Sequence, residues 1–450
     1  MVEFAVLALL LISGVEPTGT PLTLAEALAR AEQANPELLA ARERAAAQAE
    51  RAESVARTRL PRLGLASGWS RTDNPSWVFS HKLTAGEFTQ DDFAIQRLNA
   101  PASISHLTTT LGLQLPLDVF GKLGDQAAAQ RASGRAALAL AGEAHLETRT
   151  RVVEAYRRAA VASQAVGVTE RALEGARARE TDVEARVVEG AALQADLLRA
   201  RARRRQREAD LAERRADAAL ATAALSRLLG GDAGARYIAI EDAAAPAPLL
   251  ADEAALVAQA PDHRPAVAAA EGRLAAARRA ARLEGRGRLP DLVGWGQLQD
   301  DRNSFSGGGQ SYAVGAELRW SAFDPGRGRR SAAAEADVRA AEHEARAARD
   351  QVQLEVRSAF RRAVASRERH RAAAGGAEEG REALRVVQER RRAGLATLTD
   401  ELETEATSLA AELEEVRTAA EAAIADAQLE RAAGSAFGTA NHRDTETQRN

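Results

Sequence analysis

The residue types that most often carry chemistry are scarce and scattered in this sequence of 450 residues. Cysteine is absent, which rules out a disulfide framework, a thiolate metal site and a cysteine nucleophile. The seven histidines show neither an H-x-x-x-H motif nor a cluster of carboxylates around them. The G-R-G segments at 285–287 and 326–328 are typical of turns and not of phosphate-binding loops. We therefore expect no enzyme, no metal site and no cofactor.

Acidic residues provide the one spacing that could act electrostatically. Asp400 and Glu403 follow Gly394, and their three-residue step places both carboxylates on one face of a helix. In the first half of the chain, Asp196 follows Gly190 by the same six residues that separate Asp400 from Gly394. For a lone chain, the simplest interpretation is an exposed and solvated helix face.

The composition favours long helices that pack through small side chains. Alanine makes up about a quarter of the chain, far above ordinary usage. Aromatic residues contribute only 4%, although apolar residues reach 45%. A net charge of -3 and a pI near 6.3 argue against a general nucleic-acid binder, despite the many arginines. No apolar run approaches the roughly 20 residues that a membrane-spanning helix needs.

The sequence contains an internal duplication. Short motifs of the first half recur in the second half, in the same order and at two self-consistent offsets. The matched pairs are Pro36 with Pro265 and Pro61 with Pro290 at an offset of 229 residues, and Tyr156 with Phe360 and Gly190 with Gly394 at an offset of 204 residues. We therefore expect two copies of one supersecondary unit.

The duplication divides the chain into five segments. Residues 21–230 and 253–434 are the two expected repeats, and residues 231–252 form a linker rich in Gly and Pro. Residues 1–20 are expected to be a signal peptide or a disordered N-terminus. Their apolar stretch has the length of a signal-peptide core but no basic residues precede it, so a misassigned start is the alternative. Residues 435–450 are expected to be a disordered C-terminal tail.

Each repeat contains two segments in which apolar residues alternate with polar or small ones, as in strands. The predicted strands span residues 62–72, 106–117, 290–300 and 311–321. Leucines share one face of the second strand, and Gln114 lies on the other. Glu317 and Arg319 lie on the polar face of the fourth strand. The third strand alternates less cleanly, with Val293 and Trp295 in phase.

Strands of about ten residues are long enough to cross a bilayer at a tilt. A soluble sandwich shows the same alternation and is the alternative. Two observations favour strands that cross a membrane over a soluble sandwich. Trp69, Trp295 and Trp320 lie in or at the ends of the strands, where an interfacial aromatic girdle would place them. The strands also alternate with very long helices, which sandwiches lack. Four strands cannot close a barrel, for which eight is the small end, so a barrel requires several chains.

The remaining sequence predicts helices. Each repeat opens with one, at about 23–59 and 265–286, and ends in a hairpin, at about 120–229 and 325–431, that turns at Gly190 or Gly394. The last helix carries small and apolar residues at alternating steps of four and three, the spacing of a coiled-coil seam. The seam consists of Leu402, Ala406, Leu409, Leu413, Val416, Ala420, Ala423 and Ala427.

In this order of elements, the sequence resembles the TolC-type outer membrane efflux proteins over nearly its whole length. The early L-T-L-A-E-A-L-A-R-A-E-Q-A-N-P-E-L stretch, Leu60 with Pro61, and the Phe-Gly turns after the second and fourth strands carry the resemblance. The glycine turn followed six residues later by aspartate adds to it. The stretch 88–101 also looks like the first external loop of one branch of the family.

The resemblance implies a fold that is mainly α with a small β part. Three chains would form a homotrimer with a 12-stranded β-barrel in the outer membrane of a Gram-negative bacterium, surrounded by its lipid and continuous with a periplasmic α-helical barrel. It also implies an exit duct for efflux or type I secretion. The expected partners are a periplasmic adaptor (membrane fusion) protein and an inner-membrane pump of the RND or ABC type.

The resemblance also assigns roles to residues. Asp400, Glu403 and Asp196 would narrow the periplasmic entrance, where a trimer would stack the acids into rings that favour cations. Gly190 and Gly394 would form the tips to which the adaptor docks. The strand residues Gln114, Glu317 and Arg319 are candidates to face the lumen. Arg390, Arg391 and Arg392 crowd the turn before Gly394, a departure that prevents transfer of the family's closed-state hydrogen bonds.

The alternative function is a periplasmic coiled-coil adaptor or another soluble helical interaction protein. Adaptors have one helical hairpin and a lipoyl-like β module in each chain. Two duplicated hairpins and strands long enough to span a membrane weigh against that alternative.

Overall fold

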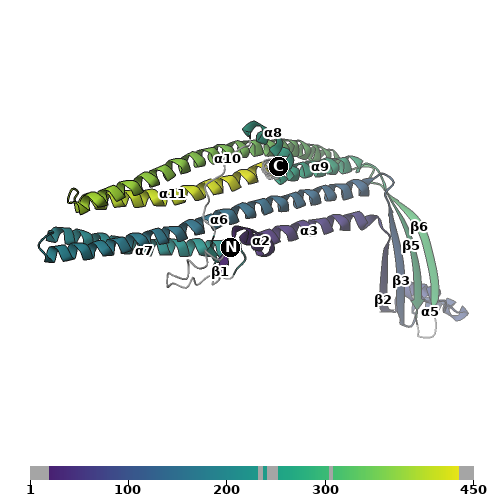
Figure 1. Cartoon of the computed structure of the whole chain (residues 1–450). Coiled ribbons are helices and arrows are strands. Elements are labelled where there is room, and N and C mark those ends of the chain that lie inside the picture. The colour runs from purple at the N-terminus through teal and green to yellow at the C-terminus, as the bar shows by residue number, and fades with distance from the viewer. Residues whose placement is uncertain (1–19, 232–236, 241–251, 304–307, 435–450) are drawn as a thin grey trace, which may run out of the picture. The chain divides into compact units, whose positions relative to one another are not determined.

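The computed structural model describes residues 20–231, 237–240, 252–303 and 308–434 (Figure 1). The expected signal peptide at 1–20, except Thr20, lies outside the described residues, as does the C-terminal tail at 435–450. Most of the expected linker at 231–252 also lies outside them. In the part of the chain that is described, no helix is both long enough and apolar enough to cross a membrane.

The chain divides into two compact units, and each unit draws on both halves of the sequence. The helical unit comprises residues 1–45, 138–269 and 346–450. The sheet unit comprises residues 46–137 and 270–345. Because two distant parts of the chain complete each unit, neither repeat forms a compact unit alone.

Four antiparallel strands form the sheet of the sheet unit, in the order β2-β3-β5-β6. The strands are β2 (Arg62–Thr72), β3 (Ile104–Leu117), β5 (Asp291–Arg302) and β6 (Gly309–Arg319). Each repeat contributes one hairpin-like pair, and the pairing of β3 with β5 joins the two pairs. The duplicated order of helix, strand, strand and helical hairpin predicted from the sequence is therefore confirmed.

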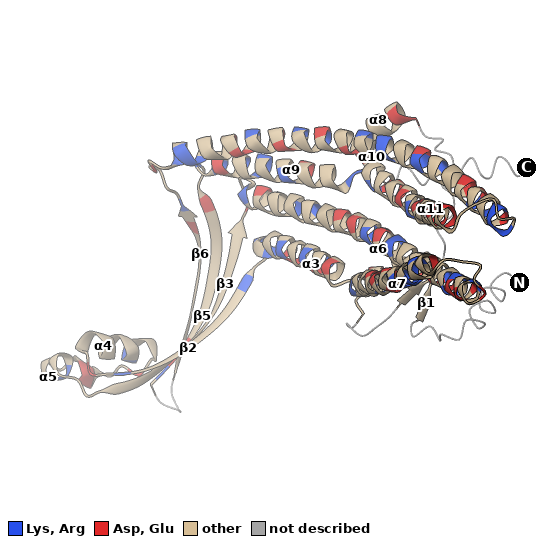
Figure 2. Ribbon diagram, turned by 90° about the vertical axis from the view of Figure 1, so that its left-hand side faces the viewer, with Lys and Arg blue, Asp and Glu red and all other residues tan. Residues whose placement is uncertain are grey.

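One face of the sheet is apolar and uncovered. Leu65 pairs with Leu111, Leu111 with Leu298, and Leu298 with Tyr312, so the register builds a continuous apolar row across all four strands. Leu65 is 73% exposed and Tyr312 77%. The sheet carries little charge on its ribbons compared with the helices, where acidic and basic residues lie along the full length (Figure 2). A face this apolar needs a non-aqueous neighbour.

The opposite face is small and polar, and it corrects one expectation. Trp295 pairs with Gln114 on one side and Gly315 on the other, so it lies on the polar face and not among the leucines. A Cβ added at Gly315 would lie 2.9 Å from the Trp295 ring, which shows that the glycine makes room for the indole. The placement of Trp295 in an outward aromatic girdle is therefore wrong, because in β5 Leu292 and Leu298 supply the apolar face instead.

A helical insertion separates β2 from β3 at one end of the sheet (Figure 2). It contains α4 (Pro75–Thr84), the 3₁₀ turn η2 (Gln90–Phe93) and α5 (Ile95–Asn99). Asn74 caps α4 by accepting hydrogen bonds from two backbone N–H groups, and Pro75 follows at the first helical position. The sequence analysis assigned only an external loop to part of this segment and missed its helices.

Eight longer helices are described in the remainder of the chain. In the first repeat they are α2 (Leu24–Ala34), α3 (Pro36–Ala56), α6 (Lys122–Val188) and α7 (Gln194–Leu228). In the second they are α8 (Glu253–His263), α9 (Pro265–Arg286), α10 (Arg327–Arg392) and α11 (Leu398–Ala433). The helix expected at 23–59 is broken at Asn35. The Asn35 side chain accepts from the Leu38 N–H and donates to the Leu228 carbonyl, and Pro36 begins the next helix.

Two equivalent cores stabilise the helical unit. One contains Val152, Tyr156, Ala159 and Leu225, which pack with α2 and with a short parallel pair of strands, β1 (Thr20–Leu22) and β4 (Tyr237–Ala239). The other contains the residues that the 204-residue offset predicts, namely Val356, Phe360, Ala363 and Leu429, together with residues of α8. The duplication therefore extends to the residues that fill each core.

The buried face of α11 differs from the predicted seam. Leu402, Leu409 and Leu413 are only half-buried, whereas Glu401 and Glu405 are buried. The seam that packs within the chain is displaced by one residue, because arginines of neighbouring helices pair with the two carboxylates. The leucine seam is left partly uncovered.

We predict that small residues set the spacing of α6 and α9 within the sheet unit. A Cβ at Gly272 would lie 2.9 Å from the Ala136 Cβ and 3.1 Å from its Cα, too close for the two helices to keep their distance. Gly272→Val should lower the free energy of unfolding by about 1–3 kcal/mol. Gly285→Val in the same helix is the control, since that site is open, and denaturant unfolding of the two variants measures the difference. Equal stabilities would contradict the close packing.

Candidate functional site at the helical hairpin tips

Both hairpins turn through the same backbone motif. The N–H groups of Gly190 and Ala191 donate to the carbonyls of Val187 and Arg186, which closes a Schellman turn at the end of α6. Gly394 and the residue after it repeat both bonds at the end of α10. The φ angles of the two glycines are +72° and +77°, a conformation that disfavours side chains. Glycine at these positions is therefore a requirement of the turn.

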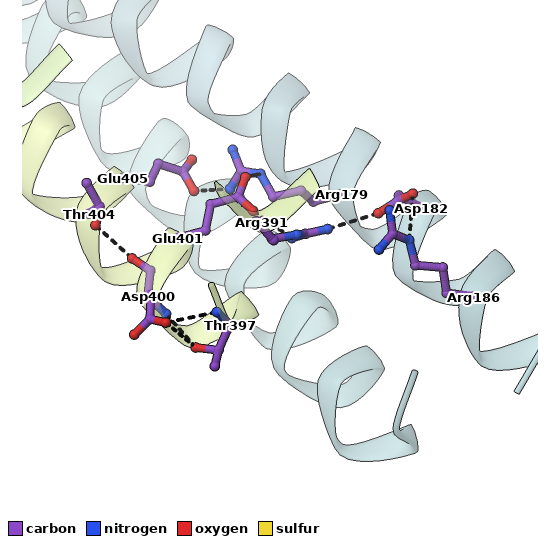
Figure 3. Close-up of polar contacts among 9 residues, drawn as sticks. All are labelled: Arg179, Asp182, Arg186, Arg391, Thr397, Asp400, Glu401, Thr404 and Glu405. Carbon is purple, nitrogen blue, oxygen red and sulfur yellow. Dashed lines mark hydrogen bonds and ion pairs between the residues drawn. The ribbon is translucent and has the colours of Figure 1, made fainter. Parts of the chain in front are cut away.

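Asp400 closes the first turn of α11. Its carboxylate accepts hydrogen bonds of 2.8 Å from the backbone N–H and the hydroxyl of Thr397, and its own N–H donates to the Thr397 hydroxyl at 3.1 Å (Figure 3). These hydrogen bonds, assisted by the nearby charge of Arg390, lower the pKa of Asp400 below its ordinary value. Asp400 thus has a structural role as a helix cap, and it remains an exposed negative charge.

The other two acidic candidates differ from Asp400. Glu403 is exposed one turn further along α11. Asp196 is in the first turn of α7, but Leu193 precedes that helix and cannot form the reciprocal cap. Instead, Asp196 forms an ion pair of 3.1 Å with Arg199. The two hairpins therefore present unequal charge, because the first neutralises its acid locally and the second leaves two exposed acids.

A cluster of ion pairs, buried around Glu401 and Glu405, lies near Asp400 and joins the two hairpins (Figure 3). We call it the hairpin cluster, and it consists of Arg179, Asp182, Arg186, Arg391, Glu401 and Glu405. Arg391 of α10 bonds Asp182 of α6 at 2.9 Å and Glu401 of α11 at 2.6 Å. Arg179 of α6 pairs with both Glu401 and Glu405. Arg179 and Arg391 thus connect the first hairpin with the second, and Arg186 pairs with Asp182 within α6.

Burial makes the cluster depend on complete pairing. The side chains of Glu401 and Glu405 are only 8% and 7% exposed, and they lie one turn apart on the same helix face. Burial lowers the pKa of Arg179, while the Glu401 carboxylate opposes that shift. A guanidinium stays charged under these conditions, so three arginines balance three carboxylates. Arg203 adds a hydrogen bond of 2.9 Å from α7 to the Leu402 carbonyl.

The sequence analysis missed the hairpin cluster but noted one of its members. In the sequence, Arg390, Arg391 and Arg392 stand out only as a crowded turn that prevents transfer of the family's closed-state bonds. In the structure, Arg391 turns inward and is the bridging residue. The signal that could have revealed the site is Glu401 with Glu405 at a four-residue step on a face that otherwise packs as core. Their partner Arg179 lies more than two hundred residues away in sequence.

The three strand candidates lie on one face of the sheet. Gln114 pairs with Arg62 of β2 and Trp295 of β5. Glu317 and Arg319 form an ion pair of 2.8 Å along β6. Among the described residues, no group of three or more His, Asp and Glu side chains is arranged to hold a metal ion.

Comparisons with known proteins give a consistent result. The sequence profile described as "Outer membrane efflux protein" matches residues 27–231 and 256–435. A comparison with curated proteins gave no match.

The solved structures add a likeness of fold. The chain is similar to the outer membrane protein VceC of Vibrio cholerae, with 21% identity and a TM-score of 0.73 over 91% of this chain and 96% of that one. It is similar to the CmeC outer membrane channel of Campylobacter jejuni, with 17% identity and a TM-score of 0.77 over 91% and 85%. It is also similar to the open state of the MtrE outer membrane channel of Neisseria gonorrhoeae, with 20% identity and a TM-score of 0.72 over 91% of this chain and 88% of that one.

We predict that loss of a buried arginine of the hairpin cluster lowers the free energy of unfolding much more than loss of an exposed arginine. Arg179→Met leaves Glu401 and Glu405 buried without their shared counter-charge and should lower the free energy of unfolding by about 3–5 kcal/mol. Arg199→Met removes only an exposed pair with Asp196 and should change it little. Urea unfolding of the two variants measures the difference. A loss in Arg179→Met as small as in Arg199→Met would contradict the role of the cluster.

Proposed function

The chain belongs to the outer membrane efflux protein family, and from this we propose that it is the exit duct of a tripartite efflux or type I secretion system. In this role it passively conducts substrates from a periplasmic pump and adaptor to the exterior. We assign it no enzymatic reaction because it belongs to a family of channel proteins.

The single observation that carries the proposal is the open four-stranded sheet. Its apolar face is fully uncovered, its other face is polar, and its edge strands β2 and β6 lack partners within the sheet. Four strands are too few to enclose a lumen. Three copies would close a 12-stranded barrel with the leucines toward lipid and Gln114, Glu317 and Arg319 toward the lumen. We therefore propose a homotrimer in the outer membrane of a Gram-negative bacterium.

The helical hairpins supply the periplasmic part of the proposed duct. The partly uncovered leucine seam of α11 offers each copy a surface for its neighbour, because half-buried leucines gain stability when a second helix covers them. The tips at Gly190 and Gly394 are then the proposed docking points for a periplasmic adaptor protein, which connects them to an RND or ABC pump. Two hairpins in one chain do not favour the alternative of an adaptor.

The acids of α11 are proposed to narrow the periplasmic entrance. In a trimer, Asp400 and Glu403 would form stacked rings of exposed charge, which attract cations. Asp196 would contribute less, because Arg199 already neutralises it. The exposed negative charge therefore lies mainly on the second hairpin.

The hairpin cluster is proposed to hold the entrance closed. Opening requires the two hairpins of a chain to separate, and the bond between Asp182 and Arg391 crosses between them. Glu401 stays paired with Arg391 within the second hairpin, so the arginine keeps a partner when the hairpins part. Separation also breaks the pairs of Arg179 with Glu401 and Glu405, so opening costs more than one ion pair and removes the Arg179 charge from the buried Glu405.

We predict that the exposed acids control block by multivalent cations. Because Asp400 also caps α11, Asp400→Asn with Glu403→Gln removes the charge and keeps the shape of both side chains. The concentration of a trivalent cation that halves conductance in a planar bilayer should rise about tenfold or more. Glu335→Gln with Asp337→Asn removes the same charge from an exposed part of α10 and is the control. Unchanged block in the first variant would remove the assignment of the acidic rings.

We further predict that Asp182→Asn increases the basal conductance. The substitution breaks one of the ion pairs between the hairpins, together with the Asp182–Arg186 pair, and leaves Arg391 paired with Glu401. Loss of a half-exposed pair worth about 1 kcal/mol shifts a two-state equilibrium roughly fivefold toward the open state. Asp210→Asn breaks the pair with Arg207 within α7 and should leave single-channel conductance unchanged. Equal conductance in both variants would show that the bond does not restrain opening.

A further inference from the structure

The helical insertion between β2 and β3 rests on the polar face of the sheet. His106 of β3 alternates with the outward Leu107 and pairs with Ser70, which places its ring on the polar side. His81 of α4 stacks on that ring, with centroids 3.7 Å apart and planes inclined by 12°. Because His81 covers His106, α4 lies over the polar face at the end of the strands, where Figure 2 shows the insertion.

Two further contacts hold α4 in this position. The Asn303 amide, just after β5, donates to the backbone carbonyl of His81 at 3.1 Å and to the Glu87 carboxylate at 3.2 Å. A Cβ added at Gly309, at the start of β6, would lie 2.0 Å from the Thr84 carbonyl oxygen. Only glycine at this position therefore lets the end of α4 come so close to the strand. The insertion that leaves β2 thus reaches across the sheet to β6.

His106 is fully engaged below the stack. Its Nδ1 lies 2.8 Å from the Asn303 Oδ1, and its Nε2 lies 3.1 Å from the Asp301 Oδ1. The Thr108 hydroxyl donates to the same Asp301 oxygen at 2.8 Å. His106 is 5% exposed and Asp301 1%. Both ring nitrogens of His106 thus face oxygens of side chains that follow or end β5.

His81 has the opposite surroundings. Its Nδ1 is buried and has no hydrogen-bond partner among the described residues, so none of them satisfies a proton on that nitrogen. Burial, and then the charge of His106, lower the pKa of His81, and Asp301 opposes them more weakly. Of the other charged groups nearby, Glu87 is bound to the Asn303 amide, and Lys82 on α4 is paired with Asp92 at 2.7 Å.

We propose that His81, His106, Asp301 and Asn303 form a histidine latch that fastens the insertion over the polar face of the sheet and releases it in acid. Protonation of His81 places a positive charge against the His106 ring, in a stack where no described residue accepts a hydrogen bond from the His81 Nδ1. Release of α4 returns that charge to water. In the proposed barrel, the polar face lines the lumen, and the latch sets the opening at the end of the strands.

The direction of the pH response follows from the lowered pKa. Above the ordinary histidine pKa of 6.5, His81 is neutral whether α4 is latched or released, and the latch keeps its full stability. As the pH falls below that value, the released state binds the proton more readily than the latched state, so the latch weakens. The weakening is complete once the pH has passed below the pKa of latched His81.

Amide hydrogen exchange of the intact chain tests the latch directly. The protection of residues 75–85, corrected for the intrinsic effect of pH on exchange, should fall several-fold between pH 7.5 and 5.5. His81→Phe keeps a flat ring on His106, loses no hydrogen bond from Nδ1 and cannot take up a proton. In that variant, the protection should stay at its level of pH 7.5.

His343→Phe supplies the matched control, since His343 is exposed on α10 and lies outside the insertion. This variant should lose protection in acid as the native chain does. Because exchange is measured without any current, the result does not depend on whether the chain forms a channel. A native chain whose α4 keeps its protection in acid would overturn the proposal, and so would an acid response of His81→Phe equal to that of the native chain.

Discussion

Backbone groups at the edges of a sheet cannot remain unpaired in lipid, and this constraint explains most of the structure. Strands β2 and β6 end the sheet with one row each of N–H and C=O groups that have no partner within it. In the proposed trimer, closure by further copies would satisfy both rows at once. It would also give the leucine face a lipid environment and enclose the polar face. Gly315, which makes room for the Trp295 ring, suits a polar face that would be turned inward in such a barrel.

The helical unit meets a different constraint, because it must be stable although its helices carry few large apolar side chains. Alanine and glycine let helices approach closely but bury little area for each residue. Near the hairpin tips, α11 turns carboxylates and not leucines toward its own chain, and arginines from α6 and α10 neutralise them. Such pairs contribute little net stability, but they fix one arrangement of the helices, because any other arrangement leaves a buried charge unpaired. The leucines remain free to pack against a neighbouring copy.

The sequence revealed the fold because its signals are periodic and repeated. The offset of 204 residues predicts even the core, where Val356 and Leu429 take the places of Val152 and Leu225. The phase of β5 could not be predicted from the sequence, because Gly294 and Gly296 lie on the leucine face and leave Val293 and Trp295 as the apparent apolar set. The hairpin cluster could not be predicted either, since an ion pair between α6 and α11 has no period and its members are distant in sequence.

The hairpin tips and the insertion between β2 and β3 differ in how their polar contacts respond to acid. At the hairpin tips, arginines do not titrate, and hydrogen bonds from Thr397 keep the pKa of Asp400 below that of a free carboxyl group. Asp400 therefore keeps its charge in mild acid. In the insertion, His81 is stacked on another histidine, and burial holds its pKa below the ordinary value. The proposed latch therefore responds to acid through His81, whereas the Asp400 cap of α11 does not.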